Sequence, residues 1–282
     1  MSIVVQHINV SRADIQGNNG LGRYFFLTGS DERARQIAEF FHQRYEKPHP
    51  RQHNMYAGQI YGLDGESVDV AAISTGMGGP SADIIINELA MLGAKRWLRV
   101  GTAGTLHPQV VKGGDLVVAT GAVRDDKASW DYIYPEFPAM ASFQYVQAAQ
   151  LAHTKQDATV HFGVVHSKSS LFARQYQFSL LKENNDYMQA IKQAGAIVSE
   201  MECAQLFTLA PILNARYYDV FNSVNTIKCG AVLAVIGDEN GFLYDAQQIK
   251  QLNARCVQFS IAITLEMDLL DKRELLLTKN HS

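Results

Sequence analysis

The sequence predicts an α/β fold, a three-layer sandwich with a central mixed β-sheet between two layers of helices. Short apolar runs alternate with longer amphipathic segments along most of the 282 residues, which is typical of strands separated by helices. Several of these runs are apolar almost throughout, as expected for strands that helices cover on both faces.

The elements follow from this alternation in chain order. The predicted strands are 24–27, 68–73, 97–100, 115–119, 161–165, 196–199 and 231–236. The predicted helices are 31–45, 81–92, 143–153, 185–193, 203–210 and 246–270. The last helix is the longest, and its apolar residues recur at helical spacing, so we expect it to cover one face of the sheet. The polar stretch 217–228 is predicted to be an exposed loop.

The composition excludes several classes of protein. Hydrophobic residues make up 47% and charged residues 19% of the chain, an ordinary globular balance, without repeats or linkers, so we predict one domain over 1–282. A net charge of -3 provides no basic surface for nucleic acid. No apolar run is long enough to cross a membrane, and the first residues do not resemble a secretion signal. The three widely spaced cysteines predict free thiols, no metal site and a cytoplasmic location.

Glycine-bearing turns follow three of the predicted strands, at 28–33, 75–81 and 101–104. Backbone N–H groups at such turns can approach an anion closely. Arg33 follows the first turn, and Arg99 lies inside an apolar strand, where an unpaired guanidinium is costly to bury. A bound phosphate would satisfy both arginines. The alternative is that Arg99 pairs with a carboxylate of the core.

Two carboxylates, Glu200 and Glu202, flank Met201 at the end of a predicted strand. Carboxylates in this position can accept hydrogen bonds from sugar hydroxyls. Alternatively, they favour the N-terminus of the following helix through its dipole. The spacing alone leaves both interpretations open.

These motifs resemble the signature of the purine nucleoside and uridine phosphorylase family, most strongly that of bacterial uridine phosphorylases. The run 74–89, with Gly-Met-Gly-Gly-Pro-Ser, carries the resemblance. Further matches follow in the same order along nearly the whole chain, at 6–8, 14–17, 98–106, 113–115, 122–124, 135–139 and 200–202. The resemblance implies a phosphorylase-like fold and reversible phosphorolysis of a nucleoside, with inorganic phosphate as co-substrate and no other cofactor.

The resemblance also assigns residues to the phosphate and the ribose. The phosphate-binding residues would be Gly29, Arg33, Arg99 and Thr102, and the two arginines would place the attacking phosphate. The ribose would be bound by Met201, Glu202 and His7, with His7 reaching in from a neighbouring subunit. This shared site implies a homodimer at least, and usually a homohexamer. Without the resemblance, His7 would be read as a surface residue near the chain end.

The base pocket departs from the uridine phosphorylase pattern. The implied base-binding residues are Gly104, Leu171, Phe172, Gln175, Gln177, Glu200 and Asp238. Gln177 stands where the family has an arginine, and Leu171 stands where a phenylalanine usually stacks on the base. A neutral glutamine stabilises a departing base anion less well than a guanidinium does. Arg174, nearby in sequence, is a candidate substitute.

Asp238 resembles the aspartate with which purine nucleoside phosphorylases protonate the departing purine, and a dry pocket would raise its pKa toward that catalytic task. Alternatively, Asp238 starts a turn with Gly237 and Gly241. At the phosphate site, Asn54 stands where the family has an arginine. Without this guanidinium, the binding free energy of phosphate would be weaker by about 1.5–3 kcal/mol. Met55 replaces a glutamate that often binds potassium in the family, so no metal site is expected.

The sequence therefore favours a phosphorylase acting on uridine or a related pyrimidine nucleoside. A purine nucleoside phosphorylase is the first alternative, because of Asp238 and Gln177. A nucleoside-binding homologue with weakened catalysis is the second, because Asn54, Leu171 and Gln177 all change the predicted site.

Overall fold

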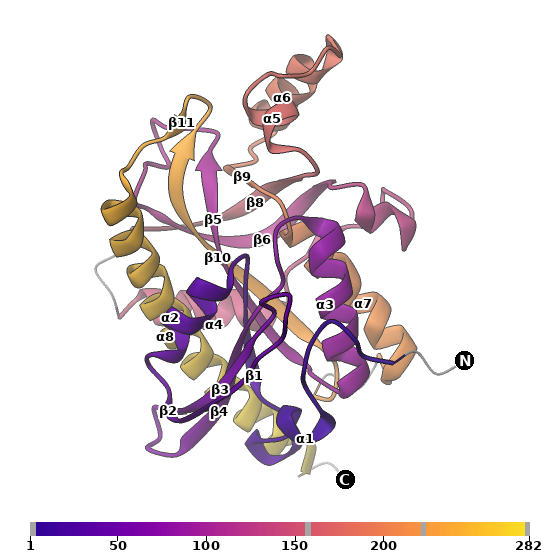
Figure 1. Cartoon of the computed structure of the whole chain (residues 1–282), viewed down its shortest axis with the longest axis vertical. Helices are drawn as coiled ribbons and strands as arrows, with labels where there is room; N and C mark the ends of the chain where they lie inside the picture. The colour runs from indigo at the N-terminus through magenta and orange to yellow at the C-terminus, as the bar shows by residue number, and fades with distance from the viewer. Residues whose placement is uncertain (1–3, 156–158, 221–223, 280–282) are drawn as a thin grey trace.

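A computed structural model describes residues 4–155, 159–220 and 224–279. It contains an 11-stranded sheet of parallel and antiparallel strands, with helices packed on both faces (Figure 1). The predicted three-layer α/β sandwich with a central mixed sheet is thereby confirmed. Within the described ranges, no helix is both long enough and apolar enough to cross a membrane.

Strands and helices alternate over part of the chain, but β2 to β4 and β5 to β7 follow one another without an α-helix between them. The strands are β1 (Tyr24–Thr28), β2 (His42–Lys47), β3 (Met55–Tyr61), β4 (Ser67–Ser74), β5 (Arg96–Thr105), β6 (Leu116–Asp125), β7 (Ala139–Met140), β8 (Val160–Lys168), β9 (Val198–Glu200), β10 (Lys228–Asp238) and β11 (Gly241–Phe242). The α-helices are α1 (Arg12–Ile15), α2 (Asp31–Ala38), α3 (Gly79–Leu92), α4 (Phe143–His153), α5 (Leu171–Gln175), α6 (Glu183–Gln193), α7 (Cys203–Tyr217) and α8 (Ala246–Lys279).

The side chains of β1 show how the layers are built. Successive residues of a strand point to opposite faces of the sheet. Phe25 and Leu27 belong to the core that includes α3 and α7, whereas Tyr24 and Phe26 belong to the core that includes α2, α4 and α8. The long helix α8 therefore covers one face, as predicted (Figure 1).

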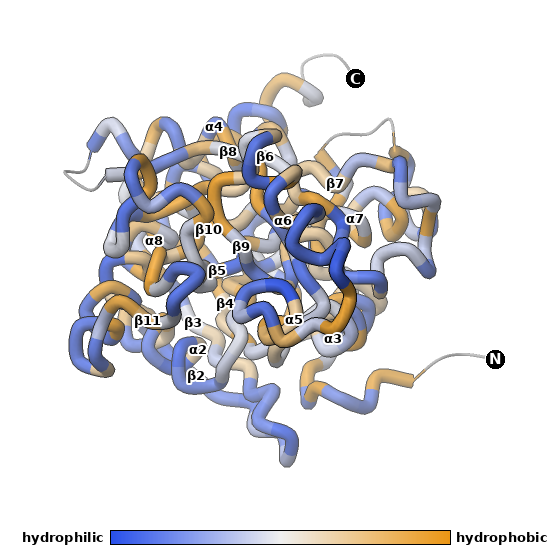
Figure 2. Tube along the Cα trace, turned by 90° about the horizontal axis from the view of Figure 1, so that it is seen from above, coloured by the Kyte–Doolittle hydropathy of each residue, from blue (hydrophilic) through white to orange (hydrophobic). Residues whose placement is uncertain are grey.

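Part of the sheet closes on itself. β5 pairs with β10, and the pairing continues through β6, β8 and β9 back to β5. Bulges interrupt the register at Val235/Gly237 and at Ala119/Gly121; bulges bend strands and increase their twist. The helices α5 and α6 stand apart at the top of the molecule in Figure 1 and lie in front of the sheet in the view from above (Figure 2).

Two local predictions were wrong at the edge of the sheet. The helix predicted over 31–45 ends at Ala38, and the following polar residues form the edge strand β2. β2 pairs with β3, a strand that the sequence analysis did not identify. The two backbones approach closely at Gly58, where a Cβ atom would lie 2.7 Å from the carbonyl oxygen of His42.

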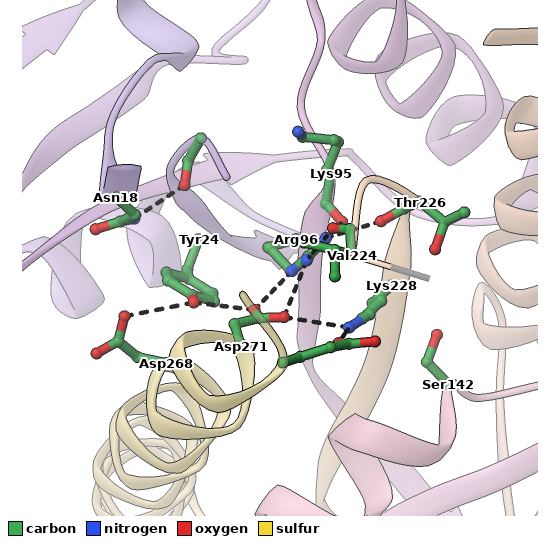
Figure 3. Close-up of polar contacts among 12 residues, drawn as sticks. Asn18, Tyr24, Lys95, Arg96, Ser142, Val224, Thr226, Lys228, Asp268 and Asp271 are labelled. Atoms are coloured by element: carbon green, nitrogen blue, oxygen red, sulfur yellow. Dashed lines mark hydrogen bonds and ion pairs between the residues drawn. The ribbon is translucent and has the colours of Figure 1, made fainter. Parts of the chain in front are cut away.

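The segment predicted as an exposed loop over 217–228 is exposed in its first part, where Tyr217 ends α7 and both Tyr217 and Val220 are exposed. It includes residues 221–223, which lie outside the described ranges, but Val224, Ile227 and Lys228 are buried. The fully buried guanidinium of Arg96 donates to the carbonyl of Val224 at 2.9 Å and pairs with Asp271 of α8 (Figure 3). A buried guanidinium requires such acceptors, which explains why this segment turns inward.

Candidate active site

A cavity of about 320 Å³ lies where the turns after β1 and β4 meet β5, β8, the end of β9, α5 and the β10–β11 turn. Most of the predicted site residues line it. These are Gly29, Arg33, Arg99, Thr102, Gly104, Leu171, Gln175, Glu200, Met201 and Glu202. His7, Phe172, Gln177 and Asp238 are not among the lining residues.

Arg33 forms one end of the cavity. Its Nη2 donates to Oδ1 of Asn253 at 3.3 Å, and its Nε is buried without a hydrogen-bond partner. Burial lowers the pKa of Arg33, and the nearby charge of Arg99 lowers it further. Because arginine stays protonated in proteins, this end of the cavity carries a positive charge with an unused donor, as an anion site requires.

Arg99 pairs with both predicted carboxylates. Its Nη2 donates to Glu202, and its Nε lies 3.4 Å from Oε2 of Glu200. Burial disfavours its charge, but the two carboxylates outweigh burial and raise the pKa of Arg99. The carboxylate pairing considered for Arg99 is therefore present, and both partners line the same cavity.

The two glutamates have different contacts. Glu200 accepts hydrogen bonds from the backbone N–H of Glu202 at 2.8 Å and of Cys203 at 3.0 Å, which secures the first turn of α7. Burial raises the pKa of Glu200, but Arg99 and these donors outweigh burial and lower it. Glu202 instead accepts from the N–H of Gly78 at 2.6 Å, and burial raises its pKa. The φ of 82° at Gly78 favours glycine.

Gln175 and Gly104 lie at the other end of the cavity. Nε2 of Gln175 donates to the backbone carbonyl of Asp238 at 2.8 Å. A Cβ atom at Gly104 would lie 2.8 Å from Nε2 of Gln175, so a larger residue here would displace this amide. The fixed amide can read the polar edge of a planar ligand.

Three predicted base-binding residues lie outside this cavity. Phe172 packs against Phe178 with ring centroids 5.4 Å apart. Gln177 lines a neighbouring cavity of about 210 Å³, which shares Gly104, Gln175 and Ser199 with the first. Oδ1 of Asp238 accepts from the N–H of Asn240 at 2.7 Å, in the turn between β10 and β11. The contacts of Asp238 therefore agree with the alternative in which this residue starts a turn.

His7 and Asn54 lie away from the cavity as well. Nδ1 of His7 donates to Glu88 on α3 at 2.7 Å, a contact within the same chain. Oδ1 of Asn54 accepts from the N–H of His49 at 2.7 Å and so holds the preceding loop. Met55 is fully buried in the core.

Arg174, considered as a substitute for the missing base-pocket arginine, is engaged elsewhere. Its Nε and Nη2 form a bidentate pair with the carboxylate of Asp125, at 2.6 and 2.8 Å. It also lies over the ring of Tyr187, 4.4 Å from the centroid. Arg174 does not line the larger cavity.

Lys168, which was not predicted as a site residue, is a cation of the cavity wall at the end of β8. Its side chain is buried, and Nζ donates to Oγ of Ser199 at 2.9 Å. Burial lowers the pKa of Lys168 to about 8. The sequence contained one signal for this role: Lys168 follows the apolar run 161–165, and ligands bind where such strands end.

The cavity thus has Arg33 at one end, Arg99 with the carboxylates of Glu200 and Glu202 between, and the amide of Gln175 and the amine of Lys168 at the other end. A ligand that combines an anion, a polyol and a polar heterocycle matches this order of charges. Across the described part of the chain, no group of three or more His, Cys, Asp or Glu side chains is placed to hold a metal ion.

Comparison with known proteins gives the family. Residues 23–253 match the model of the phosphorylase superfamily. The chain is 31% identical to uridine phosphorylase of Treponema pallidum, over 92% of this chain and 91% of that protein. It is 32% identical to uridine phosphorylase of Salmonella typhimurium, over 73% and 79%, and 32% identical to guanosine phosphorylase of Halorubrum lacusprofundi, over 51% and 56%. The chain belongs to the phosphorylase superfamily and is a pentosyltransferase of the nucleoside phosphorylase type.

Proposed function

We propose that this enzyme catalyses the reversible phosphorolysis of uridine to uracil and ribose 1-phosphate. The observation that carries the proposal is the cavity in which Arg33, Arg99 and Glu202 meet Gln175. The relatives named uridine phosphorylase match this chain over most of its length, whereas the guanosine phosphorylase matches about half of it. The cavity and the matches to uridine phosphorylases together favour a pyrimidine nucleoside as the substrate.

In this proposal, a phosphate oxygen attacks the anomeric carbon while the bond to the base breaks. Gly29, Arg33, Arg99 and Thr102 position the phosphate under a centre that develops positive charge. Glu202 and Met201 hold the ribose, together with His7 of a second subunit. Gly104, Leu171, Gln175 and Glu200 surround the base, and Phe172, Gln177 and Asp238 would have to approach it from outside the cavity.

The wider proposal follows the same resemblance. The enzyme uses inorganic phosphate and no other cofactor or metal, works in the cytoplasm as a single domain over 1–282, and assembles as a homodimer or homohexamer. Its shared sites would then need at least two subunits.

The test is a panel of nucleosides, including uridine, thymidine, inosine, guanosine and adenosine, assayed with and without phosphate. We expect uridine to be consumed only when phosphate is present, with equal amounts of uracil and ribose 1-phosphate formed. Consumption of a purine nucleoside but not uridine would replace the proposed substrate. Tight nucleoside binding without any base release would remove the proposed activity.

A purine substrate is the second candidate, favoured by the match to a guanosine phosphorylase. It would need the Asp238 carboxylate to leave its contact with the N–H of Asn240 and enter the cavity. In the same panel, an Asp238→Ala variant that keeps full purine turnover would argue against this role.

A further inference from the structure

Lys168 lies at the end of the cavity that would receive the base. Ser199, Gln175 and Gly104 line both this cavity and the neighbouring one, so they mark the shared boundary. Ser199 pairs with Gly104 of β5, whereas Nη1 of Arg33 lies 3.5 Å from the carbonyl oxygen of Val100, four residues earlier on the same strand, so Arg33 lies away from that boundary. Because Nζ of Lys168 is 2.9 Å from Oγ of Ser199, the amine lies on the boundary side.

A chain of hydrogen bonds fixes this amine. Lys168 can only donate, so it donates to Ser199, whose own hydroxyl proton is free to donate to Nδ1 of His166 at 2.9 Å. His166 then carries its proton on Nε2 and donates to Asp125 at 3.1 Å. Burial raises the pKa of Asp125, but the bonds from His166 and Arg174 outweigh burial and lower it. The chain therefore ends on a stable carboxylate.

Among the described residues, Lys168 is the cation that this cavity has at its base end, whereas Arg174 and Lys192 line the neighbouring cavity and pair with Asp125 and Glu239. Among the described residues that line the cavity, the cations are Arg33, Arg99 and Lys168. Arg33 lies at the opposite end, and Arg99 is paired with Glu200 and Glu202. Gln177, at the position of the family arginine, lines only the neighbouring cavity.

We propose that Lys168 is a catalytic residue that stabilises the departing base, and that Ser199, His166 and Asp125 are positioning residues that aim its ammonium. The inference rests on the proposed function and extends it to the leaving group. As the phosphate oxygen bonds to the anomeric carbon, the carbon–nitrogen bond breaks and its electron pair passes to the base. The ammonium donates to the carbonyl oxygen that takes this charge. It then gives the base a proton and regains one from water.

The protonated amine is the active form, which sets the direction of the pH dependence. Burial lowers the pKa of Lys168 to about 8, although the carboxylates of Glu200 and Glu202 act against burial. The charged and titratable groups around this amine and its hydrogen-bonded chain are Arg99, Asp125, His166, Arg174, Glu200 and Glu202. Activity is therefore expected to fall as the pH rises through about 8.

The experiment compares Lys168→Met and Lys168→Arg with the wild type on uridine and on 5-fluorouridine, whose base is more acidic. Lys168→Met should lower kcat for uridine by about 10²-fold or more, and less for 5-fluorouridine, because a better leaving group needs less help. Lys168→Arg should keep much of the activity and lose the decline above the wild-type pKa, since a guanidinium does not titrate there. Lys192→Met, in the neighbouring cavity, is the matched control and should change little.

Equal losses on both substrates, or a pH decline that survives in Lys168→Arg, would overturn the inference and leave Lys168 a structural role. Full activity in Lys168→Met would overturn it as well. If Lys168→Met does not fold, the pH profile of Lys168→Arg decides. A wild type that cleaves no nucleoside would refute the proposed function first and this inference with it, so the two failures are distinguishable.

Discussion

Arg33 leaves one buried nitrogen, Nε, without a partner among the residues that the structure describes. A bound phosphate would supply that acceptor, and a charged hydrogen bond of this kind contributes about 1.5–3 kcal/mol. We therefore expect Arg33→Met to raise the KM for phosphate by about 10- to 150-fold. The KM for the nucleoside should change far less. Initial rates over a phosphate titration at saturating nucleoside measure the effect.

Arg35 provides the matched control on the same helix. Its side chain is 56% exposed and lies 3.8 Å from Glu39, a surface pair of little energetic weight. Arg35→Met should leave both KM values close to those of the wild type. An unchanged KM for phosphate in Arg33→Met would refute the assignment of Arg33 to the phosphate.

The residues of the site were predictable where backbone motif and chemistry coincide. Arg33 and Arg99 stand beside glycine-bearing turns, and both line the cavity. The spacing alone did not distinguish the roles of Glu200 and Glu202. Their roles differ because Glu200 contacts the backbone at the start of α7, whereas Glu202 contacts Gly78. Lys168 escaped prediction because its partners come from strands distant in sequence.

At the scale of elements, Asp271 fastens α8 to the sheet. It accepts from Nε of Arg96 on β5 at 2.7 Å and from the hydroxyl of Tyr24 on β1 at 3.0 Å (Figure 3). Nζ of Lys228 on β10 lies 3.2 Å away. Removing one partner of a buried ion pair leaves an uncompensated charge, so we expect Asp271→Asn to lower the free energy of unfolding by about 3–5 kcal/mol. Urea denaturation measures the change.

The control is Glu39→Gln at the end of α2, because Glu39 pairs with Arg35 and both side chains are more than half exposed, at 58% and 56%. The control should lower the free energy of unfolding by about 1 kcal/mol or less.

Burial raises the pKa of Asp271, but Arg96 outweighs burial and lowers it. The stability that Asp271 contributes is thus present above the unfolded pKa of about 3.9 and lost as the pH falls below it. Equal losses in both variants would contradict the anchoring role.

The sequence predicted the elements that carry their own periodicity, such as α8 and the buried strand β1. It failed where an element exists only through pairing. The polar residues of β2 show no strand alternation, and they become a strand because β3 lies beside them. Likewise, the stretch 217–228 contains several polar residues in sequence, but the buried Arg96 binds the carbonyls of Val224 and Thr226 and turns its last part inward.

At the scale of the whole molecule, one chain supplies the cavity without His7. Glu88 holds His7 against α3, away from the residues that line the cavity. We therefore predict that His7 completes the site of a second subunit. If so, each site combines Glu202 of one chain with His7 of another. The activity of a mixed dimer should then depend on whether the substitutions of His7 and Glu202 are on the same chain or on different chains.

Co-expression of two differently tagged chains, followed by purification through both tags, yields mixed dimers for this comparison. A dimer of His7→Ala with Glu202→Ala keeps one intact shared site and should retain about half of the wild-type activity, because a symmetric dimer has two equivalent sites. A dimer of the double variant with wild type has a lesion in each site and should be nearly inactive. If His7 served its own chain, the result would reverse, because the wild-type subunit of the second dimer would keep a complete site while both subunits of the first would be damaged.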